Sequence, residues 1–485
     1  VRNASQGAQP IPADESAYTG YAMPLEFRMS KLGSQSHASF TASKSSARSK
    51  ECTLLNNPPR QQVPQSLSLV AFKEPIYFAH LFDNFIWSSF GSPWLQLSAE
   101  GKLGPLPYEA CMALSQSAFG KSHTQLDIEL DGSVTYGNAV SGVRLGLSRG
   151  GRETASLLLP MLTLIMHANV TQSWAEGEIH IGGMLALLQA CGPQAFQSST
   201  LRKAFSSSRS MLITIAMFTR RRTFLEEACW RKTPWADDPE SKSEQDKLVD
   251  VMSILPGLLE DLGPLQQDLP STTTSRKRSF CSQVQGGLQV LLGWRQAWDT
   301  SHPNIARERS RPSHSARDPL VSPSDAPRSL HYSSFACAVE HSLYNAILIC
   351  LLGLLHLVET PEAASYYTET AARQALKRDS STGGHWATPC LLAPGETWGL
   401  TGPAREIVRA FEYQLAYDQR RRESALFWLF PLGLARKVLE DDTAWSSWIE
   451  KLQDGSQASR GYGRGPRTID FNCFPLPKAS SLATL

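Results

Sequence analysis

Closely spaced cysteines are missing from this sequence, and their absence excludes several classes of site. Nine cysteines are spread over 485 residues, and the two nearest to each other are Cys337 and Cys350. Structural zinc sites usually take pairs of ligands about two to five residues apart, and disulfide frameworks are typical of short secreted chains. None of the 11 histidines lies four residues from another, as a helical metal pair would require. We therefore predict reduced, mostly buried thiols in a cytosolic or nuclear protein, with no cofactor bound by these residues.

Long apolar runs and a strong net charge are also missing. The longest mainly apolar runs, residues 155–166 and 346–355, fall short of the ~20 residues that span a membrane. The first 50 residues are rich in Ser, Ala and Gln and contain no apolar run, so we expect no signal peptide. The formal net charge is only +2, too small to attract nucleic acid or an acidic membrane through a global field. These features predict a chain without a membrane partner, in which any DNA contact is local or indirect.

The sequence motifs of common enzymes are absent as well. There is no Gly-x-Ser-x-Gly nucleophile motif. Gly120, Lys121 and Ser122 match the end of a phosphate-binding loop, but Ser115 stands where its first glycine belongs. An all-helical enzyme such as a terpene cyclase needs Asp-rich metal motifs on facing helices, and the acidic pairs of this sequence do not lie on predicted helix faces. We therefore predict that the chain is not an enzyme.

Helical periodicity dominates what is present. Tyr136, Val140 and Val143 follow the i, i+4, i+7 spacing of one helix face. Residues 154–168 are apolar nearly all round, which predicts a central helix covered on every side. The alternation typical of β-strands is nearly absent outside residues 126–130. The sequence therefore predicts an all-α fold, a large multi-helix domain.

Composition divides the chain into segments. Residues 1–66 are rich in Ser, Ala, Gln, Pro and Lys and cannot bury enough apolar surface to offset their ordering entropy, so we predict disorder there. The segment 301–329 has almost no apolar residues and is predicted to be a linker or loop. The complete division is a disordered segment 1–66, a first helical part 67–300, a linker 301–329, a second helical part 330–455 and a flexible tail 456–485.

Three short basic runs stand out at 220–222, 276–278 and 420–422. The first and third lie on or beside predicted helices, where solvated faces with i, i+4 ion pairs explain them. The middle run, Arg276, Lys277 and Arg278, lies in a Thr- and Ser-rich stretch that we predict to be an exposed loop. It is our candidate nuclear import signal.

A series of motifs follows in order along the predicted helical parts. The motif residues before position 240 are Tyr136, Trp174, His180, Gly182, Gly192, Pro193, Trp230 and Trp235. An aromatic-Pro-Leu stretch at 427–432, expected to form a turn, then precedes a predicted helix with Trp445 and Trp448. In this order the motifs resemble the fungal-specific transcription factor domain over roughly residues 67–455, which implies an all-helical regulatory domain of the zinc-cluster class.

The physical content of these motifs is packing. We expect Gly182 and its neighbour to permit close approach of helices, and Gly192 with Pro193 to end a helix. Trp230 and Trp235 are expected to be large anchors for a loop. None of these residues needs to touch a ligand.

The sequence departs from the family at its N-terminal end. Family members usually carry a cluster of six cysteines that binds zinc and DNA, but only Cys52 precedes residue 100 here. The chain opens with Val1 instead of methionine. We therefore expect either that a zinc cluster lies upstream or that this is a cluster-less member that acts through partners.

The resemblance implies a nuclear transcriptional regulator, controlling a metabolic or secondary-metabolite gene cluster. The partners that it implies are other regulators or co-regulators and a second copy of the chain, with DNA bound only indirectly or through the missing module. An apolar pocket around residues 157–166 and 346–355 is expected to take a small effector. The alternative is a helical scaffold or adaptor protein without DNA-binding activity.

Overall fold

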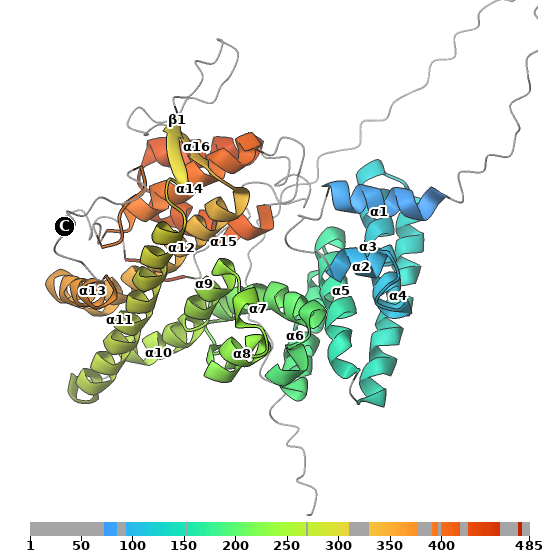
Figure 1. Ribbon diagram of the computed structural model, residues 1–485, viewed down its shortest axis with the longest axis horizontal. Helices are drawn as coiled ribbons and strands as arrows, with labels where there is room; N and C mark the ends of the chain where they lie inside the picture. The colour runs from blue at the N-terminus through green and yellow to red at the C-terminus, as the bar shows by residue number, and fades with distance from the viewer. Residues whose placement is uncertain are drawn as a thin grey trace, which may run out of the picture. The chain divides into compact units, whose positions relative to one another are not determined.

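Helices form almost all of the described structure, so the predicted all-α class is confirmed (Figure 1). The computed structural model describes residues 72–84, 94–151, 153–267, 270–309, 329–376, 390–395, 399–417, 425–455 and 474–477. The predicted disordered segment 1–66 lies outside the described residues, as does the predicted tail 456–485 apart from 474–477.

The helices and strands follow one another in chain order. As far as residue 219 they are α1 (Lys73–Asn84), α2 (Trp94–Ala99), α3 (Pro105–His123), α4 (Leu126–Arg149), the 3₁₀ helix η3 (Thr154–Leu157), α5 (Leu158–Thr171), α6 (Trp174–Cys191), η4 (Pro193–Phe196) and α7 (Ser199–Thr219). As far as residue 301 they are η5 (Phe224–Glu226), α8 (Ala228–Lys232), η6 (Thr233–Trp235), η7 (Pro239–Ser241), α9 (Glu244–Met252), α10 (Leu255–Gln267) and α11 (Pro270–Ser301). The remaining elements are β1 (Ala306–Arg309), β2 (Ser329–Tyr332), α12 (Phe335–Val358), α13 (Pro361–Ala375), α14 (Thr401–Tyr417), α15 (Ala425–Val438) and α16 (Thr443–Gly455).

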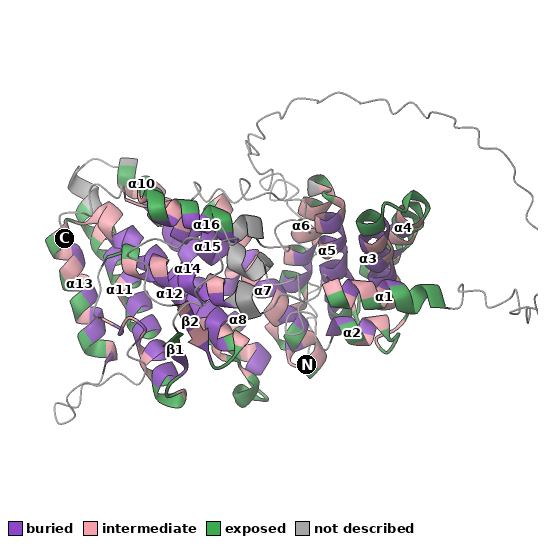
Figure 2. Ribbon diagram, turned by 90° about the horizontal axis from the view of Figure 1, so that it is seen from above, coloured by how far each residue is buried: buried purple, intermediate pink, exposed green. Residues whose placement is uncertain are grey.

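Helix α5 is the centre of the first group of helices. It packs against α3, α4, α6 and α7, and every residue from 157 to 165 is buried (Figure 2). The predicted helix covered on all sides is therefore confirmed. The neighbouring helix α4 contains the predicted periodic face at Tyr136, Val140 and Val143, and the alternating residues 126–130 form its first turn instead of a strand.

Helix α12 has the same role in the second group of helices. It packs against α9, α11, α14 and α15, and residues 341–355 are all buried. The helix starts at Ser334, whose hydroxyl accepts a hydrogen bond from the backbone N–H of Cys337. This N-cap satisfies one of the unpaired donors of the first turn.

The predicted linker 301–329 is wrong at both of its ends. Residues 306–309 form β1, which pairs antiparallel with β2, so that Ala306 lies opposite Tyr332. Ile305 and Ala306 are buried, and their burial fixes this end of the segment against the core. The prediction missed it because the segment as a whole contains few apolar residues. Residues 310–328 lie outside the described part of the chain.

Helix α15 corrects the expected turn at 427–432. Pro431 lies inside the helix, where it cannot donate a backbone hydrogen bond. Burial of Phe430, Leu432 and Leu434 supplies apolar contact that offsets this loss. Trp445 and Trp448 are buried on α16, so the predicted helix that follows is confirmed.

Two helical stretches are long and apolar enough by composition to cross a membrane, Thr154–Thr171 and Phe335–Val358. In both of them most residues are buried against other parts of the chain, 72% and 78% of the tested windows respectively. Burial on that scale is typical of core helices.

Contacts along the chain divide it into two units, Val1–Lys73 and Glu74–Leu485. Both predicted helical parts fall in the second unit from Glu74 onward. Contacts of α12 with α9, α10 and α11 join the two parts across the predicted linker.

Candidate functional site

A group of aromatic and imidazole side chains brings together two of the motif residues, Tyr136 on α4 and His180 on α6. The Tyr136 hydroxyl lies 2.7 Å from Nε2 of His180, and the Tyr136 ring stacks on His167 of α5 with centroids 4.4 Å apart. Ser117 of α3 reaches His167 from the other side, with its Oγ 2.9 Å from Nε2. The group therefore joins four helices through two hydrogen bonds and one ring stack.

Burial governs the titration of this group. Burial, with a smaller contribution from His180, lowers the pKa of His167 to about 4. Burial also lowers the pKa of His180, although Glu176 opposes the effect. For Tyr136, burial and Glu176 raise the pKa to about 12. Both imidazoles are therefore neutral at physiological pH, which is the form that a structural hydrogen-bond network requires.

The motif residues after His180 mostly shape the backbone. Gly192 ends α6 with φ 72, and Pro193 begins η4, so the prediction that this pair ends a helix is confirmed. Gly182 is exposed, and an added Cβ would meet nothing within 4 Å. The predicted close helix approach at Gly182 is therefore wrong, because this residue faces away from the neighbouring helices. Trp174 is the first residue of α6, and its side chain lies outside the described residues.

The two motif tryptophans after α7 are buried anchors, as predicted. Trp230 packs among aromatic rings, 4.8 Å from Phe224 and 5.8 Å from Phe205 between centroids. Trp235 lies below two cations: the Arg209 guanidinium is 4.8 Å from its ring centroid and the Lys242 ammonium is 4.5 Å away. Trp235 thus contacts two members of an ionic cluster, Arg209 and Lys242.

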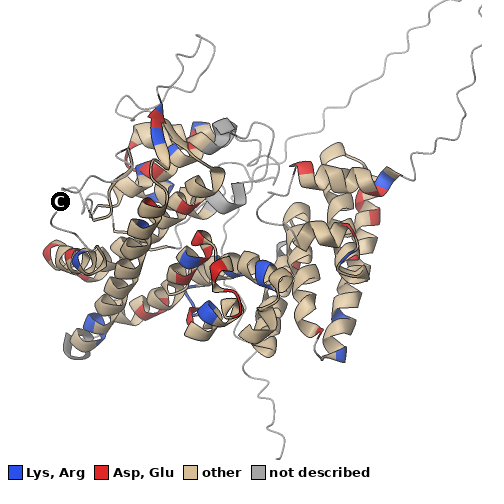
Figure 3. Ribbon diagram, in the orientation of Figure 1, with Lys and Arg blue, Asp and Glu red and all other residues tan. Residues whose placement is uncertain are grey.

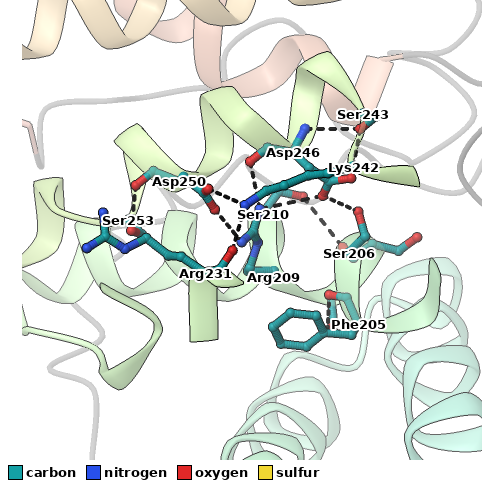
Figure 4. A network of polar contacts seen from close by, with 12 residues as sticks. Phe205, Ser206, Arg209, Ser210, Arg231, Lys242, Ser243, Asp246, Asp250 and Ser253 are labelled. Atoms are coloured by element: carbon teal, nitrogen blue, oxygen red, sulfur yellow. Dashed lines mark hydrogen bonds and ion pairs between the residues drawn. The ribbon is translucent and has the colours of Figure 1, made fainter. Parts of the chain in front are cut away.

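The Arg209 cluster consists of Arg209 on α7, Lys242 before α9, and Asp246 and Asp250 on α9 (Figure 4). Arg209 is completely buried. Its Nη1 donates to Asp250 Oδ1 at 2.6 Å, and its Nη2 donates to the backbone oxygen of Asp246 at 2.8 Å. The cluster ties α7 to the start of α9.

Neighbouring polar groups complete the Arg209 cluster. Lys242 bonds Asp250 Oδ2 and donates to the backbone oxygen of Arg231 at 2.6 Å. Ser206 and Ser243 both donate to the Asp246 carboxylate, Ser243 at 2.7 Å. The buried Asp246 carboxylate and the partly exposed Asp250 carboxylate therefore each accept from more than one donor. Sequence reading missed the cluster, although two aspartates four residues apart beside Leu248 and Val249 were a usable signal.

A second buried ionic group, the His341 cluster, is made of Arg295, Asp299, His341, Asn345 and Glu406. All five side chains are buried, and they come from α11, α12 and α14. His341 Nε2 lies 3.0 Å from Glu406 Oε2, and Asn345 donates to the same carboxylate oxygen at 3.2 Å. On α11, Arg295 Nε donates to Asp299 Oδ2 at 3.0 Å.

The protonation of His341 follows from its two neighbours. Burial raises the pKa of Tyr332 well above its ordinary value, so its hydroxyl stays protonated and donates to His341 Nδ1 at 2.8 Å. Burial lowers the pKa of His341 even though Glu406 opposes this. Burial alone would raise the pKa of Glu406, but His341 and Arg295 together lower it. A neutral imidazole with its proton on Nε2 fits the contacts with Tyr332 and Glu406, and Asn345 Nδ2, 3.2 Å from the same Nε2, then donates to Glu406 only.

The His341 cluster holds a segment of backbone, residues 390–395. The backbone N–H of Leu392 donates to Glu406 Oε1 at 2.6 Å, and the backbone oxygen of Leu392 accepts from Arg295 Nη2 at 3.2 Å. Two buried atoms of the cluster, Arg295 Nη1 and Asp299 Oδ1, have no hydrogen-bond partner among the described residues. An unpaired buried polar atom costs free energy unless water or a ligand reaches it.

A small pocket lies beside this segment. It is lined by Leu292, Tyr344, Asn345, Leu348, Leu392, Ala393, Gly395 and Pro403. A water-sized sphere can move its centre through about 10 Å³ there, which is room for about one water molecule. Leu348 belongs to the apolar run 346–355 around which an effector pocket was predicted, but residues 157–166 do not line this pocket. An effector larger than water would have to displace residues 390–395.

Searches among known protein families, curated proteins and solved structures found no significant match.

The candidate import signal is not in a loop. Arg276, Lys277 and Arg278 lie in α11, because the helix starts at Pro270 and buries Phe280 and Cys281 just after the basic run. Lys277 pairs with Glu359, with Nζ 3.0 Å from the carboxylate. The run is therefore a helix face with an ion pair, the arrangement that was expected for the first and third runs.

The other basic runs can be placed in part. Arg222 pairs with Glu226 at i, i+4 and with Asp261 on α10, as predicted for the first run. The run 420–422 lies outside the described residues. The seven described cysteines form no disulfide, and four of them are buried, which agrees with the predicted reduced thiols. Among the described residues, no three His, Cys, Asp or Glu side chains are grouped so as to hold a metal ion.

Proposed function

We propose that this chain is the regulatory region of a fungal transcriptional regulator of the zinc-cluster class. The observation that carries the proposal is the order of the family motifs together with the contact between two of them. Tyr136 and His180 are 44 positions apart in the sequence, yet their side chains are hydrogen-bonded. A chance set of motif matches gives no reason for such a contact, whereas a shared domain does.

In this proposal the chain transmits regulation and does not itself read DNA. The formal net charge of +2 gives no broad basic surface for the phosphate backbone. DNA contact is supplied by a six-cysteine cluster outside these residues or by a partner regulator. The chain acts in the nucleus, on a metabolic or secondary-metabolite gene cluster, and carries out no catalysis.

The proposed point of regulation is the His341 cluster. Its carboxylates outnumber its cations, and two of its buried atoms have no hydrogen-bond partner among the described residues. It also hydrogen-bonds both the backbone N–H and the backbone oxygen of Leu392. A small effector that displaces residues 390–395 would gain the hydrogen bonds of Arg295 and Glu406. In a thermal-shift screen with pathway metabolites, a ligand for this site stabilises the wild type and fails to stabilise Arg295→Met.

Tethering tests the proposed function directly. The full chain, fused to a heterologous DNA-binding domain, should change the transcription of a reporter placed behind the matching DNA site. The same chain without that domain, carrying a fluorescent tag, should enter the nucleus, and replacement of Arg276, Lys277 and Arg278 by Gln should reduce entry if this run is the signal. Val290→Glu, at an exposed position of α11, is a matched surface control that should leave both readouts unchanged.

The scaffold alternative gives the opposite results. A soluble, folded fusion that leaves the reporter unchanged, together with a tagged chain excluded from nuclei, would overturn the proposal in favour of an adaptor role.

A further inference from the structure

The outward face of α4 exposes four large aliphatic side chains among its polar ones. Leu126, Leu130, Val134 and Leu145 are exposed to 68%, 57%, 67% and 49% respectively. At 100° per residue they fall on one stripe of the helix. The buried residues Gly132, Ala139 and Val143 lie on the opposite side of α4. A stripe of large aliphatic side chains on the solvent face of a helix marks a contact surface.

The glycines of α4 support the same interpretation. An added Cβ at Gly132 would lie 2.9 Å from the backbone nitrogen of Ser117, at Gly142 2.5 Å from Leu106, and at Gly146 2.8 Å from Leu157. Packing within the chain therefore explains these three glycines. Gly137 is different, because an added Cβ there would meet nothing within 4 Å.

Gly137 lies on the exposed stripe, between Val134 and Ser141. Glycine in an exposed helix interior costs about 1 kcal/mol relative to alanine, and no contact among the described residues compensates for that cost at Gly137. Small residues at the middle of a helix face allow a second helix to approach closely. The side chains on the stripe are thus large and aliphatic towards the two ends of α4 and small at its centre.

Charge on α4 is divided between its two ends. The first turns contain Asp127, Glu129 and Asp131, whereas the last turns contain Arg144 and Arg149 (Figure 3). A second α4 running antiparallel would place the acidic end of each helix beside the basic end of the other. Antiparallel pairing also opposes the helix dipoles favourably.

We propose that α4 is a dimerisation surface whose occupant is the α4 helix of a second copy of this chain, packed antiparallel about a two-fold axis near Gly137 and Asn138. In this register Leu130 lies opposite Leu145 of the second copy, and Val134 lies opposite Ser141. The surface is self-complementary in shape and charge, as a two-fold interface requires. The inference does not depend on the proposed transcriptional role.

The expected dimer is weak. Helix α4 has 24 residues, so it is about 36 Å long and presents a strip about 10 Å wide. Two such strips amount to roughly 700 Å², which is below the size of a standard stable interface. Dimerisation should therefore depend on concentration in the micromolar range or above.

Sedimentation velocity of the full chain, from about 1 µM to about 200 µM, tests the proposal. The wild type should pass from monomer to dimer over this range. Val134→Glu should raise the dissociation constant about tenfold or more, because a dimer would bury two unpaired carboxylates. The matched control Val290→Glu introduces the same charge at a 60% exposed valine of α11 and should dimerise like the wild type. Circular dichroism of both variants checks that the helices are intact.

Gly137→Ala separates an interface role from a purely local one. The change should raise the melting temperature of the monomer, because alanine favours the helix, while it weakens the dimer severalfold. Equal dimerisation of Gly137→Ala and the wild type would contradict the placement of the axis.

Charge reversal tests the antiparallel orientation. A variant with Asp127 and Asp131 changed to Lys, and another with Arg144 and Arg149 changed to Glu, should each be monomeric, since like charges then face each other at both ends. Mixed together, the two variants should form a heterodimer. A wild type that stays monomeric throughout, equal effects of Val134→Glu and Val290→Glu, or variants that fail to associate on mixing would overturn the proposal.

Discussion

The Arg209 cluster and the His341 cluster solve the same physical problem with a different balance of charge. Both hold a buried arginine next to two carboxylates, and in the Arg209 cluster the Asp250 carboxylate is partly exposed. In the Arg209 cluster, Lys242 supplies a second cation, so two positive charges face two negative ones. In the His341 cluster the second basic group is an imidazole whose pKa burial lowers, so one negative charge is in excess.

This difference separates a structural ionic cluster from a responsive one. Each cluster has a buried arginine nitrogen without a hydrogen-bond partner among the described residues, Arg209 Nε and Arg295 Nη1, so charge balance is what distinguishes them. A cluster with an excess charge can change state when a proton, water or ligand arrives. The two clusters therefore make different predictions for mutation and for acid.

The largest expected effect is loss of the Arg209 guanidinium. Arg209→Ala leaves Asp246 and Asp250 without their main cation, and the free energy of unfolding should fall by about 3–5 kcal/mol. Arg222→Ala is the matched control, because the Arg222 side chain also pairs with two acids but is 42% exposed. It should cost about 1 kcal/mol or less. Urea denaturation compares the two variants, and similar losses would show that burial is not what makes Arg209 important.

Acid should act on the buried histidines. Because the folded state lowers the pKa of His167 from 6.5 to about 4, the unfolded state binds more protons between these values. Stability is therefore full above about pH 6.5 and falls by about 3 kcal/mol as the pH drops towards 4. His341 contributes with the same sign, since its pKa is also lowered.

Two substitutions separate these contributions. His167→Gln and His341→Gln should each flatten the fall in urea-denaturation free energy between about pH 7 and about pH 5. Ser117→Ala keeps the titrating imidazole of His167 while it removes a hydrogen bond, so it should lower stability without flattening the curve. An unchanged curve in both histidine variants would mean that neither imidazole is neutral in the folded protein.

A smaller effect is expected at Glu406. Glu406→Gln removes the excess charge of the His341 cluster but weakens the charge-assisted bond to the Leu392 N–H, for a net cost of about 2 kcal/mol. Hydrogen exchange at the Leu392 amide should accelerate at the same time. Acceleration confined to this segment supports local release, whereas an unchanged Leu392 rate would show that Glu406 does not hold it.

The smallest effects concern the helix caps near each cluster. Ser243 caps α9 and also donates to the buried Asp246 carboxylate, whereas Ser334 caps α12 and otherwise contacts only the uncharged thiol of Cys337 among the described residues. Ser334→Ala should cost about 1 kcal/mol, and Ser243→Ala should cost about 2 kcal/mol because Asp246 loses a donor too. Equal thermal shifts would indicate that Ser243 adds nothing to the Arg209 cluster beyond its cap.

Local chemistry made part of this structure predictable. The all-α class, the central α5 helix and the helix end at Gly192 follow from periodicity and from the conformational freedom of glycine. The loop expected at 276–278 failed because Ser and Thr weaken a helix only slightly, and burial of Phe280 outweighs that preference.

The hydrogen-bond and ion-pair partners that are far apart in the sequence could not be predicted from it. Arg209 and Asp250 are 41 positions apart, and Asn345 and Glu406 are 61 apart. Each partner alone looks like an ordinary surface residue of an amphipathic helix. Only the packing of α7 on α9, and of α12 on α14, gives these charges their buried environment.

The burial of α12 also has a consequence for synthesis of the protein. The helix leaves the ribosome before α14 and α15, which later cover it, and until then its 24 residues have a composition apolar enough for a membrane span. A chain truncated after α13 would keep that surface exposed permanently. Such a product should be captured by chaperones or aggregate, so premature stop codons between residues 376 and 401 are expected to abolish the protein instead of shortening it.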